Sequence, residues 1–341
     1  MLTVGMTGLI TKRSVSLIAT SMAMVAVLMF TQTSSSPASL LALTSEWTEW
    51  TDGEAAVKMP MLHFSIDAFG KADTDVDRLI QIGWRGFSLM NHDGLPAMKK
   101  VGTAIKKAIA SGAYSREDFF VSITQFCGTP AAKFIQATGL EYVDLSVLHS
   151  ACPEHDLPAG MAGAPKTPYG NPPSAEFAAY PDATQAGSLA EWRKYEALHE
   201  AGKAKAIGVS RFTDEDLAAL IKAAEVKPAV NAREFNLATH DFASIQHNVD
   251  LGVVFYGYSP FGSYHQATDK IIGKKEVKKV AAAHPGFTKY QVALRWAIQH
   301  GVPMLVFSSD LSVGGHAQQL LDVMKKLTLT ATEMDLLDKA K

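Results

Sequence analysis

EYVDLSVLH, at residues 141–149, is an apolar and largely β-branched or aliphatic stretch. Such a run predicts a central strand that is buried on both faces. His149 stands at its C-terminal end, and in a parallel barrel this end of the strands carries the chemistry. The order of strand, polar end residue, loop and helix recurs downstream, most clearly in GKAKAIGVS at 202–210. One strand-and-helix unit is therefore repeated along the chain.

Hydrophobic runs of strand length alternate with helical periodicity through the rest of the chain. This alternation predicts an α/β fold of the parallel (β/α)8 TIM barrel class. A doubly wound open sheet is the structural rival, but no Gly-x-Gly-x-x-Gly turn follows an early strand. The predicted strands are 59–66, 86–90, 119–124, 141–149, 206–210, 229–235, 253–258 and 304–307. The predicted helices are 76–82, 97–111, a short one between 127 and 141, 189–201, 214–224, 241–249, 269–283, 289–300 and 317–327.

Two further features are expected at the C-terminal face of this barrel. A long, proline-rich loop from 150 to about 188 is expected to shape a pocket there. Arg233 and Glu234, on a short strand, are expected either to line that pocket or to form a solvated pair.

Composition excludes some classes of function. The chain has 341 residues, 47% hydrophobic and 19% charged, which is ample for one large globular domain. A net charge of −2 gives no electrostatic footprint for nucleic acid, so no nucleic-acid partner is predicted. The two cysteines, Cys127 and Cys152, are too few for a disulfide framework, and they do not fix the redox compartment.

Residues 1–45 form a separate segment, because they contain no Asp or Glu. Lys12 and Arg13 precede the uncharged run 14–30, and a tail rich in Ser, Thr and Ala follows it. This order predicts a secretory signal peptide, or an uncleaved transmembrane anchor through 14–30, with a plastid or mitochondrial transit peptide as the alternative. We therefore assign 46–341 to the barrel domain and predict a secretory or membrane-anchored location.

A series of short motifs follows in order from residue 59. They are Met59-Pro60, Gly83-Trp84-Arg85, Arg116-Glu117-Asp118-Phe119-Phe120, Tyr142-Val143-Asp144-Leu145, His149, Gly202-Lys203, Ile207-Gly208-Val209-Ser210, Tyr258-Ser259-Pro260-Phe261-Gly262 and Gln291-Val292-Ala293-Leu294-Arg295-Trp296. Each motif alone is weak, but in this order and spacing the chain resembles the aldo-keto reductases. The resemblance implies a barrel that binds NADP(H) at its C-terminal face and reduces a small-molecule carbonyl substrate by hydride transfer.

The family's chemistry needs a Tyr general acid, a Lys that lowers its pKa, an Asp paired with the Lys, and a His that orients the carbonyl. The resemblance places the His at His149. It places the Asp at Ser88, the Tyr at Asp93 and the Lys at Thr124, so three of the four groups are replaced. Losing the Asp and the Lys together avoids a buried unpaired charge, which would cost about 3–5 kcal/mol. His92, beside Asp93, is the better proton donor at neutral pH, so His149, Asp93 and His92 are the candidate catalytic residues.

The resemblance also implies cofactor contacts, of which the sequence keeps a part. Where the family has an Asn, this chain has Arg211, whereas Tyr258 is the type of ring that stacks on nicotinamide. The family's Lys and Arg that meet the 2′-phosphate fall on Ser308 and on Gly314 or Gly315, which removes the strongest phosphate contacts. An NAD-like or altered ligand is therefore the alternative to NADP(H). The candidate cofactor-binding residues are Ser210, Arg211, Tyr258, Ser259 and Ser309.

Three functional hypotheses follow. The favoured one is a catalytically impaired or inactive barrel, a pseudoenzyme kept as a ligand-binding or protein-interaction module. The second is a diverged NAD(P)H-dependent oxidoreductase for a small carbonyl, in which His149 works with His92 or Asp93. The third is metal-assisted chemistry through His149, Cys152 and His155, although no second half-site supports a metal centre.

Overall fold

The structure, a computed structural model, describes residues 47–52, 55–66, 74–154, 183–262 and 268–340. The chain divides into two units, 1–42 and 43–341, and the description below concerns the second. The predicted targeting segment 1–45, with its apolar run 14–30, lies outside the described residues, as does His155. Within the described ranges, no helix has both the length and the apolar composition that crossing a bilayer requires.

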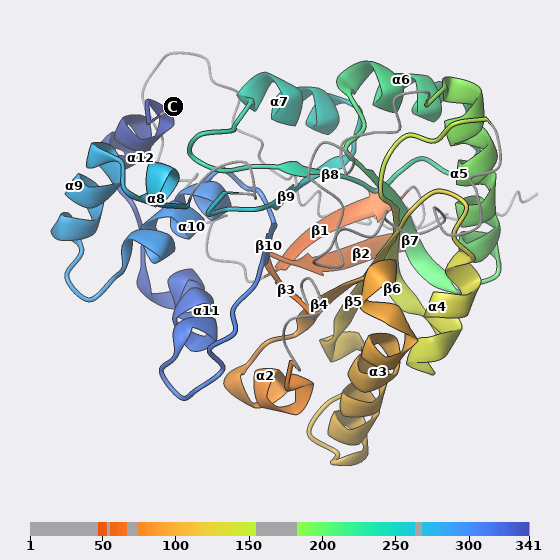
Figure 1. The fold of residues 1–341 in the computed structure, drawn as a ribbon, viewed down its shortest axis with the longest axis horizontal. Helices are drawn as coiled ribbons and strands as arrows, with labels where there is room; N and C mark the ends of the chain where they lie inside the picture. The colour runs from red at the N-terminus through yellow and green to blue at the C-terminus, as the bar shows by residue number, and fades with distance from the viewer. Residues whose placement is uncertain (1–46, 53–54, 67–73, 155–182, 263–267, 341) are drawn as a thin grey trace, which may run out of the picture. The chain divides into compact units, whose positions relative to one another are not determined.

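Eight parallel strands close into a barrel in the order β10-β3-β4-β5-β6-β7-β8-β9, which confirms the predicted (β/α)8 fold (Figure 1). Every residue of the strand between 143 and 148 is buried, as the opening stretch of sequence predicts. The barrel strands are β3 (Leu62–Ser65), β4 (Gly86–Met90), β5 (Phe120–Gln125), β6 (Val143–Leu148), β7 (Ala204–Ser210), β8 (Val230–Glu234), β9 (Val254–Tyr258) and β10 (Met304–Val306).

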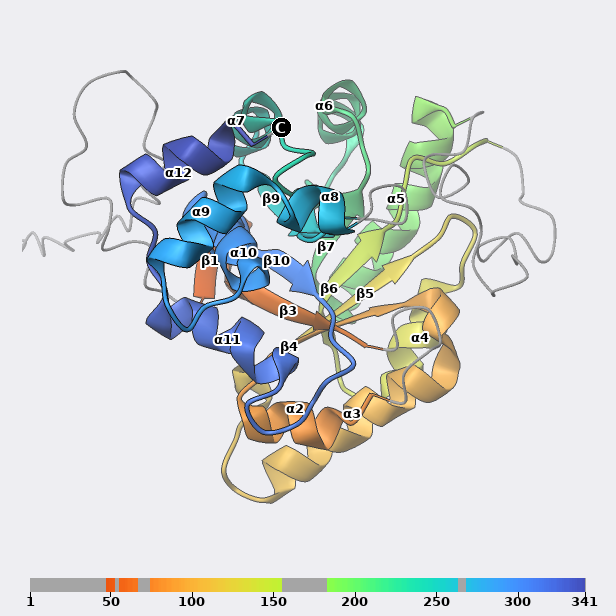
Figure 2. The same ribbon diagram turned by 60° about the vertical axis from the view of Figure 1, so that its left-hand side comes forward.

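The helices lie around the outside of the barrel (Figure 2). Several begin at a Thr or Asp whose side chain accepts a hydrogen bond from the first turn; Thr213, for example, accepts from Asp216 N. They are α2 (Val76–Ile82), η3 (Asn91–Asp93), α3 (Gly94–Ala110), η4 (Arg116–Asp118), α4 (Ala131–Thr138), α5 (Gln185–Glu200), α6 (Asp214–Ala223), α7 (Phe242–Asp250), α8 (Thr268–Ile272), α9 (Lys275–Ala283), α10 (Lys289–Gln299), α11 (His316–Lys326) and α12 (Ala331–Asp338).

Three elements differ from the sequence prediction. The expected strand 59–66 is split, because its first residues end β2 (Ala55–Pro60), which pairs with β1 (Trp47–Asp52) in an antiparallel hairpin. The expected helix 269–283 is two helices, α8 and α9. Helix α12 was not predicted, and it packs back through Asp338, which accepts hydrogen bonds from Trp296 Nε1 at 2.7 Å and His300 Nε2 at 2.8 Å.

The hairpin closes one end of the barrel interior. Met59, near the end of β2, is fully buried in an inner cluster with Phe120, Leu145 and Tyr256. Because β2 runs directly into the start of β3, this plug lies at the N-terminal end of the strands. The opposite, C-terminal end is therefore the face at which a ligand has access.

Candidate functional site

Two strand ends at the C-terminal face carry backbone in the left-handed region. Arg211, directly after β7, has φ 61°, and Ser259, directly after β9, has φ 55°. Among the described residues these are the non-glycine residues with positive φ. Such conformations cost about 1–3 kcal/mol each and cluster at functional sites. Both residues belong to the predicted cofactor-binding set, so the backbone geometry supports a site at this place.

Arg211 and Tyr258 lie together at the centre of this site. The guanidinium carbon of Arg211 is 5.7 Å from the centre of the Tyr258 ring, within the range of a cation–π contact. Burial raises the pKa of the Tyr258 phenol, and the Arg211 charge opposes that rise. Ser210, beside Arg211, is 4% exposed and ends β7. The structure therefore brings together four of the five predicted cofactor residues, Ser259 included.

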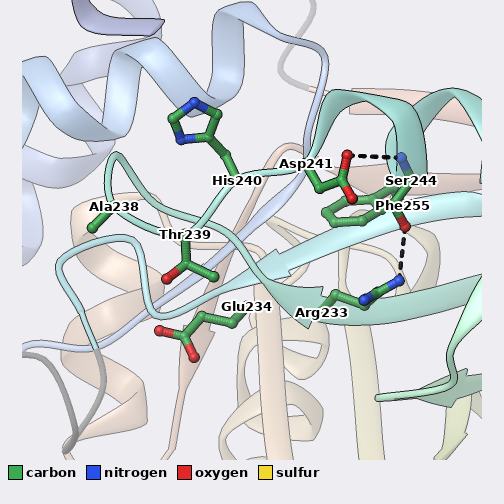
Figure 3. A pocket seen from close by; sticks show the side chains of 8 residues that line it. All are labelled: Arg233, Glu234, Ala238, Thr239, His240, Asp241, Ser244 and Phe255. Carbon is green, nitrogen blue, oxygen red and sulfur yellow. Dashed lines mark hydrogen bonds between the residues drawn. The ribbon is translucent and has the colours of Figure 1, made fainter. Parts of the chain in front are cut away.

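Asn236, in the loop after β8, holds the backbone of Ser259 in place. Asn236 donates through Nδ2 to Glu234 Oε1 at 3.1 Å and to Ser259 O at 3.1 Å. Arg233 and Glu234 line a cavity of about 220 Å³ beside α7 (Figure 3). Arg233 reaches toward Ser244 and Asp214, with which it makes hydrogen bonds of 2.7 and 3.0 Å. This cavity is not the expected pocket beneath the loop 150–188, so the predicted lining of that pocket stays a prediction, and Arg233 pairs with Asp214 rather than with Glu234.

His149 is held between the ends of β5 and β6. It is 5% exposed, and its backbone N–H donates to Gln125 O at 2.8 Å. Its ring centre lies 4.4 Å from that of Phe126. The side chain thus has a fixed, largely buried seat at the C-terminal face, as expected for a residue at the end of β6.

Asp93 has a local structural role. It ends η3, and its Oδ2 accepts a hydrogen bond from the Met90 backbone N–H at 2.7 Å. The carboxylate therefore caps the turn that connects β4 to α3. The side chain of His92 lies outside the described residues, so the structure does not test its predicted role.

Ser88 and Thr124, the positions that the resemblance assigns to the paired Asp and Lys, differ in how deeply they are buried. Ser88 is 4% exposed and fully inside the barrel, as the pairing argument requires. Thr124 is only half-buried, near the end of β5, so the expectation that both positions are fully buried is wrong for Thr124. A longer side chain at 124 would reach toward the open face of the barrel.

Tyr256 fills the barrel interior opposite Ser88. It is 4% exposed, its ring centre is 5.0 Å from that of His63, and Ser88 is the polar side chain that faces its hydroxyl. The phenol has no hydrogen-bond partner of good geometry among the described residues. Burial raises its pKa, and burial lowers the pKa of His63 to about 3, so both groups are neutral. Sequence reasoning missed Tyr256, although its place two residues before Tyr258 puts it on the same inward face.

Cys127 and Cys152 form a disulfide at the same face. Cys127 follows β5 and Cys152 follows β6, their Cα atoms are 5.8 Å apart, and each residue is 2% exposed. The bond ties together the two loops that flank His149. Sequence reasoning excluded a disulfide framework and did not pair the two cysteines, although each follows the end of one of two neighbouring strands.

The disulfide corrects the metal hypothesis. Because Cys152 Sγ is bonded to Cys127, it does not supply the thiolate that a metal site would use. Within the described ranges, no group of three His, Cys, Asp or Glu side chains could hold a metal ion. His155, the third proposed ligand, lies outside those ranges.

Replacing both cysteines by serine is expected to lower the free energy of unfolding by about 3 kcal/mol, because the cross-link closes a loop that includes α4 and β6. Denaturant unfolding of the two proteins measures this difference. A reducing agent should lower the stability of the parent by a similar amount and leave the Cys127→Ser/Cys152→Ser variant unchanged. Equal stability of parent and variant without reductant would contradict a formed disulfide.

Asp310 lies in the loop between β10 and α11, and its carboxylate faces the first N–H group of α11. Its Oδ1 accepts from Ser312 N at 3.1 Å and Ser312 Oγ at 2.6 Å, and its Oδ2 accepts from His316 N at 3.2 Å. These bonds, led by that from the Ser312 hydroxyl, hold the pKa of Asp310 below its ordinary value. Ser308 Oγ accepts a hydrogen bond from Asp310 N at 3.1 Å, and Ser309 is exposed in the same loop.

Comparisons with known proteins agree with this geometry. A model of the aldo/keto reductase family matches residues 131–341. The chain is 30% identical over 258 residues to deoxymugineic acid synthase 1 of Zea mays, covering 72% of this chain and 76% of that protein. It is 28% identical over 229 residues to the NAD(P)H-dependent D-xylose reductase I,II of Candida tropicalis, covering 62% of this chain and 68% of that protein. The crystal structure of MGS-M4, an aldo-keto reductase enzyme from a deep-sea metagenome library, shares the fold, with a TM-score of 0.62 at 21% identity over 83% of this chain and 92% of that one.

Proposed function

Because the chain belongs to the aldo-keto reductase family, we propose that it is a barrel that binds a small ligand at its C-terminal face without carrying out the family's carbonyl reduction. The observation that carries the proposal is the arrangement around Ser88. Where the resemblance expects a carboxylate that is paired with an ammonium, the chain has a neutral hydroxyl faced by the buried, neutral phenol of Tyr256.

Two candidate proton donors in the described part of the chain, Asp93 and Tyr256, are poorly suited to act as the general acid, which supports the same proposal. A proton donor must lie within reach of the carbonyl oxygen and have a pKa near the working pH. Asp93, at the position of the family's Tyr, uses its carboxylate to cap the turn after β4. Tyr256 is buried, and its pKa is raised rather than lowered. The family-model match begins after β5, so it does not include the strands that carry Ser88 and Thr124.

The residues fit the implied cofactor only in part. A bound nicotinamide would supply the hydride, and Tyr258 is the ring on which the resemblance would stack it. Arg211, however, lies over that ring, so a nicotinamide would have to displace the guanidinium or share the ring with it. At the other end, the loop between β10 and α11 offers the carboxylate of Asp310 instead of cations. NADP(H) as a whole therefore does not fit the residues present.

We expect the full-length protein, mixed with NADH or NADPH and a panel of small aldehydes and ketones, to oxidise neither cofactor above the uncatalysed rate. Absorbance at the nicotinamide band measures this directly, and fluorescence titration in parallel shows whether a cofactor is bound. Sustained turnover that is lost in a His149→Gln variant would overturn the proposal and favour the diverged oxidoreductase. An active relative assayed alongside serves as the positive control.

We also propose that the protein works in an oxidising compartment, as the predicted secretory segment implies. The support is the buried Cys127–Cys152 disulfide, because such bonds persist in the secretory pathway and are rare in the cytosol. Alkylation of thiols in protein taken directly from cells, before and after reduction, tests this. Labelling of both cysteines without reduction would contradict the proposal.

A further inference from the structure

The outer face of α8 and α9 carries a concentration of lysines. Residues 268–290 contain six lysines and two acids, although the whole chain has a net charge of −2. Helix α9 packs against α10 and α12 and lies outside α10 (Figure 2), so its other side meets solvent. Five of the lysines are exposed or half-exposed on α8, on α9 and between them, and we call them the lysine surface: Lys270, Lys274, Lys275, Lys278 and Lys279.

The charges of the lysine surface are not neutralised within the described part of the chain. The one ion pair that it forms there joins Lys275 Nζ to a carboxylate oxygen of Glu276 at 3.8 Å, with the Lys275 side chain 93% exposed. Such a pair contributes little in water. Glu333, on the neighbouring α12, accepts a hydrogen bond from His284 Nε2 at 2.9 Å instead of meeting a lysine. The side chain of Asp269 lies outside the described residues.

Local helix stability does not account for these lysines. Lys274 is the N-cap of α9 and makes no capping hydrogen bond, and Lys275 is the first helical residue. The N-terminus of a helix favours anions, so cations are unfavourable there. Lys275 and Lys279 also repel each other, because like charges four residues apart lie on the same face. An anion bound from outside the chain would offset both effects.

The arrangement of the lysine surface suits a linear polyanion. Residues three or four apart on a helix have Cβ atoms about 5–6 Å apart, so the ammonium groups follow one another along α9 instead of converging on one point. A small anion would meet one or two of them, and salt would screen that attraction. A polymer with charges on successive units meets several at once, and the counterions that it releases strengthen the association. Runs rich in lysine are typical of sites for nucleic acid or for heparin-like polysaccharide.

The Cys127–Cys152 disulfide favours the polysaccharide over the nucleic acid. Buried disulfides of this kind persist in the secretory pathway and outside the cell, where acidic polysaccharides are the abundant linear polyanions. We propose that the lysine surface binds an acidic polysaccharide through its carboxylate or sulfate groups. The inference rests on the proposed oxidising compartment and goes beyond the binding of a small ligand at the C-terminal face of the barrel.

Calorimetric titration of the full-length protein with polygalacturonate and with heparin tests the inference, because one probe carries carboxylates and the other carries sulfates as well. We expect the parent to bind at least one of them, and to lose about tenfold or more in affinity as salt rises from about 50 to about 200 mM. The variant Lys274→Gln/Lys278→Gln/Lys279→Gln should bind about tenfold or more weakly than the parent, with a shallower dependence on salt.

The matched control is Lys99→Gln/Lys106→Gln/Lys107→Gln. It removes the same charge from α3, which lies away from α9 (Figure 1), so it should bind as the parent does. Replacing the three lysines of α9 by arginine, which keeps the charge, should preserve binding. Thermal melting checks that each variant is folded.

The outcomes separate the inference from the proposals on which it rests. Equal losses in the two Lys→Gln variants would overturn it, because the attraction would not depend on the lysine surface. Binding of neither polysaccharide by the parent at about 50 mM salt would also overturn it. Tighter binding of polyglutamate or duplex DNA than of either polysaccharide would overturn the polysaccharide class. Thiol alkylation tests the compartment, and turnover tests carbonyl reduction, independently of all these titrations.

Discussion

With a nicotinamide cofactor docked, carbonyl reduction is expected to return when Ser88→Asp, Asp93→Tyr and Thr124→Lys are combined with Tyr256→Val, and not when Tyr256 is kept. The three changes rebuild the acid, its ammonium partner and the carboxylate that the resemblance implies. The new side chains need space inside the barrel, and the Tyr256 side chain faces Ser88 there. We expect the fourfold variant to exceed the threefold variant by about 10²–10⁴ in rate, the usual contribution of a positioned general acid.

The matched control carries Phe in place of Tyr at position 93. It has the same ring and the same loss of the Asp93 cap, but it has no proton to give. Rates are measured with both NADH and NADPH, so that the outcome does not depend on the nucleotide preference. If the Phe control is as fast as the fourfold variant, any activity does not come from a Tyr at 93. If the threefold variant is as fast as the fourfold one, Tyr256 does not occupy the space that the rebuilt pair needs.

Because Thr124 is only half-buried, the Thr124→Lys variant alone is expected to lose less stability than a fully buried position would. Thr124→Lys alone would strand a charge if the site were sealed, at about 3–5 kcal/mol. Because Thr124 is half-buried near the open end of β5, the ammonium can extend toward water, as long amphipathic side chains do. The single variant should therefore lose less stability than a sealed site implies. Ser88→Asp alone, at a buried position, is expected to be the more costly of the two.

The elements that sequence periodicity determines were predicted well. All eight barrel strands were expected, because each is an apolar run of strand length followed by an amphipathic helix. The β1–β2 hairpin was missed because Met59 and Pro60 continue the apolar run of β3, so only the pairing of the strands shows the break. Helix α12 was missed because its docking depends on Asp338 meeting Trp296 and His300, which are distant in sequence.

The candidate site was predictable as a set of positions but not as a set of contacts. His149, Ser210, Tyr258 and Ser259 could be placed at strand ends from their order in the chain. The side chains that take the place of the family's catalytic groups could not be predicted in this way, because their positions depend on partners from other strands and loops. Tyr256 comes from the strand opposite Ser88, and the role of Asp310 depends on the turn that returns His316 to it. Substitutions that compensate one another in space leave no local signal in one sequence.

Arg116→Leu is expected to lower the free energy of unfolding by about 3–5 kcal/mol, because it leaves the Asp144 carboxylate buried without its partner. Arg116 Nη2 lies 2.6 Å from Asp144 Oδ2, and the side chains are 15% and 10% exposed. The guanidinium also donates to Phe119 O at 2.7 Å and lies 4.1 Å from the centre of the Tyr142 ring. Asp144 Oδ2 also accepts from Val121 N at 2.9 Å, so this carboxylate links both η4 and β5 to β6.

The pH dependence and two further variants identify the stranded charge as the cause. Burial raises the pKa of Asp144 above its ordinary value of 3.8, and Arg116 opposes the rise, so removing Arg116 raises that pKa further. The protonated carboxyl stabilises the fold at low pH, and that stability is lost as pH rises through the folded-state pKa. The loss of unfolding free energy in Arg116→Leu, measured by denaturant unfolding, should thus be largest at neutral pH and shrink on acidification.

Two control variants test the same cause. Arg116→Leu/Asp144→Asn, which keeps an acceptor for the Val121 N–H, should recover much of the lost unfolding free energy. Lys107→Leu, which breaks a pair with side chains 71% and 45% exposed, should cost at most about 1 kcal/mol. A similar loss in Arg116→Leu and Lys107→Leu, or no recovery in the double variant, would show that the ion pair between η4 and β6 does not have this role.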